Sequence, residues 1–268
     1  MTMLFCHHVL ASSLVQPELR WHHVRSLPDA PASVIPIKML HYLAAFAALK
    51  LARYIQKERI EVLCLSGDSA RDFCVPLLLG AYEAEGMAAT AFPELLYFNG
   101  ASLGHFYEDD DDLSETSPAR RAQEIFKPVS TRYACFVDDH VNDGIKAFHV
   151  CKILKPHVNP RFKYLTLIAR GDHGSAQGSI PLVAGFRVTF GGLYGLAWDF
   201  SGFCKGEHHI DGTSYQKEHA INIIKAMAAV LTFEKLSFWA RQIFWLRERF
   251  APSPLGQAAA IFGGKAST

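Results

Sequence analysis

Short apolar runs that alternate with helix-patterned stretches constrain the fold of this chain more than any other feature of its sequence. The strand candidates are residues 60–66, 90–98, 133–139, 161–170, 184–190 and 193–200. The helix candidates are 37–57, 73–86 and 143–155, where apolar residues recur at helical spacing or follow a strand. Strands that alternate with helices are typical of an α/β protein, so we predict a mainly parallel sheet with flanking helices.

The positions of prolines and the local composition suggest that the chain has four parts. Residues 1–35 carry several prolines and form an N-terminal arm, and residues 36–212 form the α/β domain. Residues 213–250 add a C-terminal helical element, either one long helix or a helix pair, and residues 251–268 end the chain as a flexible tail.

Composition excludes several classes of protein. Lysine and arginine number 27 against 26 aspartates and glutamates, a formal net charge of +1, so we expect no general nucleic-acid binding. We expect no membrane span, because no apolar run approaches the length of about 18 residues that crosses a bilayer. The six cysteines form no C-x-x-C pair and several lie in apolar runs, which favours a reducing compartment and predicts a cytoplasmic protein.

The segment VDDHVNDGIKA (137–147) carries the clearest chemical signal. An apolar strand runs into Asp138 and Asp139, and after three residues Asp143 and Gly144 open a helix. Ligands of open α/β sheets bind beyond the carboxyl ends of the strands, and the free N–H groups of a helix start suit a phosphate. Two adjacent carboxylates before such a cradle can hold ribose hydroxyls or a magnesium ion, and composition alone does not distinguish the two.

This segment resembles the phosphoribosyl-pyrophosphate (PRPP) signature of the type I phosphoribosyltransferases. Two further segments resemble motifs of that family in the right order. VLCLSGDSARDFCVPLL, upstream, is similar to its pyrophosphate loop, and PLVAGFRVTFGGLYGLAWDFSGFCKG, downstream, is similar to the closing region of the hypoxanthine/guanine branch. The resemblance covers residues 37–212 and is divergent. It implies a phosphoribosyltransferase-like fold for the α/β domain.

The resemblance also implies a reaction and a set of residues. A nitrogen nucleophile, usually a nucleobase, displaces pyrophosphate from PRPP with the help of Mg²⁺, so the expected partners are small molecules. Carried over by position, Asp138 and Asp139 hold the ribose, directly or through magnesium, and Asp199 meets a second metal ion. The remaining PRPP-binding candidates are Ser66, Gly67, Asp68, Arg71, Asn142, Asp143, Gly144, Ile145, Lys146, Ala147 and Lys205. Tyr194 or Trp198 would stack on the acceptor, and Asn142 and Asp143 occupy the catalytic positions.

Departures from the family pattern leave two functions open. Asn142 stands where the purine branch has an acid, and an amide cannot take a proton. Asp143 replaces the phosphate-loop threonine, Ser66 the pyrophosphate-loop lysine and Ile180 the purine-contacting lysine. The first hypothesis is an enzyme that acts on an unidentified nitrogen acceptor. The alternative is a catalytically degenerate protein of the same fold that binds PRPP or a nucleotide as a sensor or effector.

The helical element at 213–250 has large apolar residues, among them Phe238, Trp239 and Trp245. Packing on its own domain is the default interpretation. A homodimer face or a membrane-surface face is the second.

Overall fold

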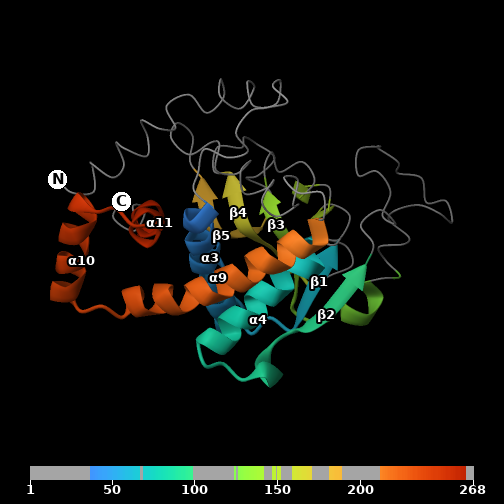
Figure 1. The fold of residues 1–268 in the computed structure, drawn as a ribbon. Helices are drawn as coiled ribbons and strands as arrows, with labels where there is room; N and C mark the ends of the chain where they lie inside the picture. The colour runs from blue at the N-terminus through green and yellow to red at the C-terminus, as the bar shows by residue number, and fades with distance from the viewer. Residues whose placement is uncertain are drawn as a thin grey trace.

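In the computed structural model, five parallel strands form one sheet, and the helices α3 (Ile37–Glu58), α4 (Val75–Ala84) and α9 (Gly212–Glu234) lie over one of its faces (Figure 1). The structure describes residues 37–66, 69–98, 124, 126–141, 147, 148, 150, 151, 159–170, 181–188 and 212–263. The strands are β1 (Val62–Ser66), β2 (Glu94–Phe98), β3 (Ala134–Val141), β4 (Lys163–Arg170) and β5 (Leu182–Val188). Their order in the sheet is β2-β1-β3-β4-β5, and each neighbouring pair is parallel. This confirms the predicted α/β class and five of the six strand candidates; residues 193–200 lie outside the described residues.

The described residues include helices at the three positions expected near 37–57, 73–86 and 213–250. The helices of these residues are α3 (Ile37–Glu58), η1 (Ala70–Cys74), α4 (Val75–Ala84), α9 (Gly212–Glu234), α10 (Phe238–Phe250) and α11 (Pro254–Gly263), with short 3-10 turns η2 (Ala89–Ala91) and η4 (Lys127–Val129). The predicted helix at 73–86 is preceded by η1, a π-helical turn. The element expected at 213–250 is the helix pair α9 and α10.

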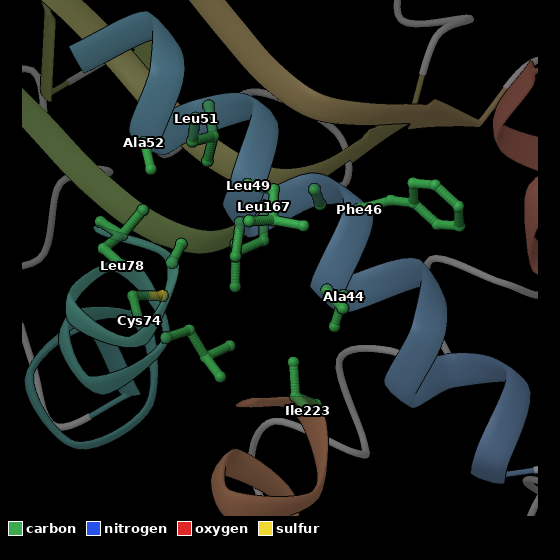
Figure 2. Packing of buried hydrophobic residues seen from close by; sticks show 14 of the residues in the cluster. Ala44, Phe46, Leu49, Leu51, Ala52, Cys74, Leu78, Leu167 and Ile223 are labelled. Atoms are coloured by element: carbon green, nitrogen blue, oxygen red, sulfur yellow. The ribbon is translucent and has the colours of Figure 1, made fainter. Parts of the chain in front are cut away.

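The main core lies between one face of the sheet and the helices α3, α4, α9 and α11. Figure 2 shows its centre, where Leu49 of α3 lies against Leu167 of β4, with Cys74 and Ile223 contributed by neighbouring helices. A second apolar cluster covers the opposite face and includes Phe136, Tyr164 and the helical residues Ala147 and Val150. Alternate residues of β3 enter the two clusters, as the two-residue period of a strand requires.

The C-terminus differs from the expected flexible tail. Residues Pro254–Gly263 form α11, and Ala258, Ala259 and Ile261 are buried. The ring of Phe262 stacks on Phe46, with 4.8 Å between centroids. The small alanine side chains let this helix lie close against the core.

Gly185 of β5 marks a close approach between the sheet and α3. A Cβ atom at this position would lie 2.7 Å from the Cβ atom and 2.8 Å from the carbonyl oxygen of Ala47. Both distances are shorter than a carbon–carbon or carbon–oxygen contact allows. The two Ala47 atoms are a backbone oxygen and a Cβ atom, so no side-chain rotation can move them away. This contact explains why a glycine stands here, within the segment that resembles the closing region of the hypoxanthine/guanine branch.

We therefore expect Gly185→Ala to destabilise the chain by about 1–3 kcal/mol, the usual cost of overpacking a core. Urea unfolding followed by circular dichroism measures the change. Gly86→Ala is the control: Gly86 has a φ of +72° and nothing within 4 Å of a built Cβ atom, so it reports only the backbone cost of a left-handed position. A loss in Gly185→Ala below about 1 kcal/mol would contradict the close helix–strand contact.

Candidate functional site

The order of the strands places a switch point between β1 and β3. From β1 the chain first adds β2 on one side of the sheet, and β3, β4 and β5 then extend it on the other side. In open α/β sheets a ligand crevice lies outside the carboxyl ends of the strands at such a point. Leu65 of β1 pairs with Val137 of β3. The next residues, Ser66 and Asp138, therefore lie side by side at the carboxyl end of β1. The structure thus brings together two segments that the sequence assigned to one site.

Asp138 is held inside the sheet by a neighbouring tyrosine. Its carboxyl group is 4 % exposed, and its Oδ2 atom accepts a hydrogen bond from the hydroxyl group of Tyr164 on β4 at 2.6 Å. The Oδ1 atom accepts the N–H of Asp139 at 3.0 Å. Burial, reinforced by the charge of Asp138, raises the pKa of Tyr164 well above its usual value, so the phenol stays protonated and donates. The tyrosine fixes the carboxylate in one orientation.

Asp139 is equally buried and belongs to the other face of the strand. Its Oδ1 atom accepts the N–H of His140 at 2.9 Å and lies 3.1 Å from the Nδ1 atom of the same residue. Because neighbouring residues of a strand point to opposite faces, Asp138 and Asp139 approach the edge of the sheet from its two sides. The strand was expected to end at residue 139, but β3 runs two residues further, through Val141. Both carboxylates therefore lie just inside the strand end.

Arg71 lies on η1, the π-helical turn that follows the β1 loop. Its guanidinium group donates two hydrogen bonds to Asp72, each of 2.7 Å, and its Cζ atom lies 5.2 Å from the ring centroid of Tyr97 on β2. Tyr97 pairs with Leu65 of β1, which puts the arginine near the carboxyl end of the sheet. Single π-helical turns occur often at functional sites, because they re-aim the side chains of one turn. Arg71 is thus placed near the edge to which the sequence assigned it.

The other predicted site residues divide into one buried residue and a group that the structure does not describe. Ala147 is helical and 1 % exposed within the second apolar cluster, so its side chain supports the core. Outside the described residues lie Gly67, Asp68, Asn142, Asp143, Gly144, Ile145, Lys146, Tyr194, Trp198, Asp199 and Lys205.

Tyr164 is the residue that sequence reasoning missed. It lies in the strand predicted at 161–170, where no role was assigned to it, and its ring stacks on Phe136 with 4.7 Å between centroids. Tyr164 pairs with Phe136, and its hydroxyl group reaches Asp138, which lies two residues further along β3. Only the register of β3 against β4 reveals this, and nothing in the sequence fixes that register.

The carboxylates suit a magnesium ion that is held in part by substrate. Mg²⁺ prefers oxygen ligands and often takes only one or two carboxylates, with phosphate oxygens and waters completing its shell. Asp138 and Asp139 are carboxylates of this type, one on each face of β3. Within the described residues no three His, Cys, Asp or Glu side chains come together as a complete metal-binding set. Nor does any helix of that part of the chain have the length and apolarity to cross a membrane.

Comparison with solved structures finds distant similarity to phosphoribosyltransferases. No protein-family model matches the sequence, and no curated protein does. A solved hypoxanthine-guanine-xanthine phosphoribosyltransferase is 16 % identical, with 56 % of this chain and 76 % of that chain covered and a TM-score of 0.38. A hypoxanthine phosphoribosyltransferase from Trypanosoma cruzi, solved with the product IMP, is 9 % identical, with 56 % and 77 % covered and a TM-score of 0.35. Both are phosphoribosyltransferases, the family whose motifs the sequence resembles.

Proposed function

We propose that this chain is a phosphoribosyltransferase-like enzyme that binds PRPP with Mg²⁺ at the carboxyl edge of its sheet. It transfers the phosphoribosyl group to a nitrogen acceptor that is not identified, with a nucleobase as the first candidate. The observation that carries the proposal is the position of Asp138 and Asp139, two buried carboxylates at the end of β3 beside the end of β1. Their place at the switch point supports the motif that the sequence carries there.

In this reaction the acceptor nitrogen forms a bond to the anomeric carbon while the bond from that carbon to pyrophosphate breaks. Pyrophosphate leaves with the electron pair, and the acceptor loses a proton. Asp138 and Asp139 would hold the ribose hydroxyls or a magnesium ion, which would neutralise charge on the pyrophosphate. Tyr164 would keep Asp138 in its orientation, so that the carboxylate does not reorganise as charge develops on the ribose.

The other roles are assigned by position in the sequence. Residues 142–147 would cradle the 5′-phosphate, with Asn142 and Asp143 nearest the chemistry. Arg71 and Lys205, with Ser66, Gly67 and Asp68, would bind the pyrophosphate. Tyr194 or Trp198 would stack on the acceptor, and Asp199 would meet a second magnesium ion. We also propose a reducing, cytoplasmic setting, which agrees with the four buried free cysteines Cys64, Cys74, Cys135 and Cys151.

A second candidate is a protein of this fold that binds PRPP or a nucleotide without turnover. One observation favours it: each carboxylate oxygen of Asp138 already accepts a hydrogen bond from the protein. The replacements at Asn142, Asp143, Ser66 and Ile180 point the same way. A carboxylate committed to structure would still complete a binding site in which catalysis has been lost.

Release of pyrophosphate distinguishes the two candidates. The full chain is incubated with PRPP, Mg²⁺ and a panel of nucleobases and small amines, and pyrophosphate is measured with a coupled enzyme assay. We expect release that depends on one class of acceptor and that falls at least about a hundredfold in Asp139→Asn, the loss typical of removing one electrostatic contact to a transition state. Binding of PRPP without release from any acceptor would support the sensor.

A further inference from the structure

The outer face of α10 carries an apolar stripe that the fold does not bury. Trp239, Ile243, Leu246 and Phe250 follow one another at intervals of four, three and four residues, so they lie on one side of the helix. Their side chains are 75, 68, 54 and 84 % exposed. In Figure 1 the helix stands at the periphery of the molecule, beyond the end of α9 and away from the sheet. Contiguous apolar surface of this kind marks an interaction site in a soluble domain.

The opposite face of the same helix attaches it to the rest of the chain. The rings of Phe244 and Trp245 contact Phe233 of α9, with 4.9 and 6.0 Å between centroids. Glu248 is buried and accepts hydrogen bonds from the N–H and the hydroxyl group of Ser253. The helix begins at Ser237, whose Oγ atom accepts the N–H of Ala240. The stripe is therefore free to meet a partner while the helix stays in place.

The charges around the stripe are basic. At 100° per residue Arg247 and Arg249 lie about 70–90° to either side of the stripe, and both are exposed. Arg241, nearly opposite the stripe, donates a hydrogen bond to the carbonyl oxygen of Glu234. Glu248, the one acidic residue of α10, faces Ser253 and not the stripe. The face that meets solvent thus combines large apolar side chains with flanking arginines.

We infer that this face of α10 binds an anionic lipid surface, as an amphipathic helix lying in the plane of the interface. Tryptophan, phenylalanine and leucine on one side with flanking arginines is the arrangement by which such helices bury their apolar face among acyl chains and keep their cations at the headgroups. A second copy of the chain fits less well, because pairing two such faces brings arginines against arginines. The inference is independent of the function proposed for the sheet edge.

Flotation of the full chain with vesicles tests this binding. We expect the chain to float with vesicles of phosphatidylcholine and phosphatidylserine, and to stay behind with phosphatidylcholine alone. Arg247→Glu with Arg249→Glu should weaken binding at least about 25-fold, from about fivefold for each arginine near an anionic surface. Leu246→Ser with Trp239→Ser should also abolish flotation, whereas Arg247→Lys with Arg249→Lys should keep it. Ile221→Ser is the matched control, because Ile221 is an apolar residue of α9 that is 52 % exposed.

Circular dichroism checks that each variant folds, and size-exclusion chromatography with light scattering checks its association. Equal flotation of the parent and the Trp239→Ser/Leu246→Ser variant would overturn the inference. So would a parent that fails to float with either kind of vesicle. A parent that does not float but is a dimer, and that becomes a monomer in Leu246→Ser, would assign the stripe to a second copy of the chain instead.

Discussion

Addition of PRPP with Mg²⁺ should raise the melting temperature of this chain. A ligand that binds only the folded state stabilises it by about 2.7 kcal/mol at one hundred times its dissociation constant. For a chain of this size that gain corresponds to about 5–10 °C. Differential scanning fluorimetry across a titration of PRPP, with and without Mg²⁺, measures the shift. This readout does not require turnover, so it applies to the enzyme and to the sensor alike.

Replacing the two carboxylates should remove most of the shift. In Asp138→Asn with Asp139→Asn the amide oxygens keep some hydrogen bonds, but the negative charge that a magnesium ion requires is gone. Glu61→Gln with Glu94→Gln is the matched control, because it removes the same charge near the amino ends of β1 and β2. Asp139→Asn alone serves if the double variant does not fold, since Tyr164 then keeps its bond to Asp138.

Asp143→Thr should act in the opposite direction. It removes a negative charge where a phosphate is expected and restores a hydroxyl donor, so PRPP should bind more tightly than to the parent. No shift in the parent at millimolar PRPP, and none in Asp143→Thr, would contradict the binding proposal. An equal shift in the parent and the Asp138→Asn/Asp139→Asn variant would place the ligand elsewhere on the chain.

The sheet could be predicted from the sequence because its elements are locally patterned. The apolar residues of α3 recur at helical spacing, and Met39, Leu43, Phe46, Leu49, Leu51 and Ile55 are all buried as that pattern requires. The position of Asp138 and Asp139 near the carboxyl end of a buried strand also followed from local order. Local patterns of this kind need no knowledge of which elements meet.

What the sequence could not predict depends on which elements meet. The burial of α11 requires Phe46 of α3, more than 200 residues earlier in the chain, as the partner of Phe262. The bond between Tyr164 and Asp138 requires the register of two strands. In both cases the residues involved have no local peculiarity, so tertiary contact alone decides their environment. The same holds for a pair of histidines that join α3 to α9.

The stability of the chain should fall steeply between pH 6.5 and pH 4 because of that pair. His41 and His219 are 9 and 3 % exposed, and the Nε2 atom of His41 lies 2.8 Å from the Nδ1 atom of His219. A hydrogen bond of this kind needs one nitrogen with a proton and one without. Burial lowers the pKa of His41 from 6.5 to about 4, which keeps its ring neutral in the folded chain.

The direction follows from proton binding in the two states. Above pH 6.5 the ring is neutral whether the chain is folded or not, and the pair contributes its full stability. As the pH falls below 6.5 the unfolded chain takes up a proton that the folded chain refuses, so folding is progressively disfavoured until about pH 4. The loss is on the order of 1–3 kcal/mol from His41.

Urea unfolding at several pH values between 7.5 and 4.5 gives the slope of stability against pH. His41→Gln, which can still hydrogen-bond to His219 but does not titrate, should flatten this slope. Parallel slopes for the parent and His41→Gln would mean that other groups govern the acid limb, and that the histidine pair joins α3 to α9 without sensing pH.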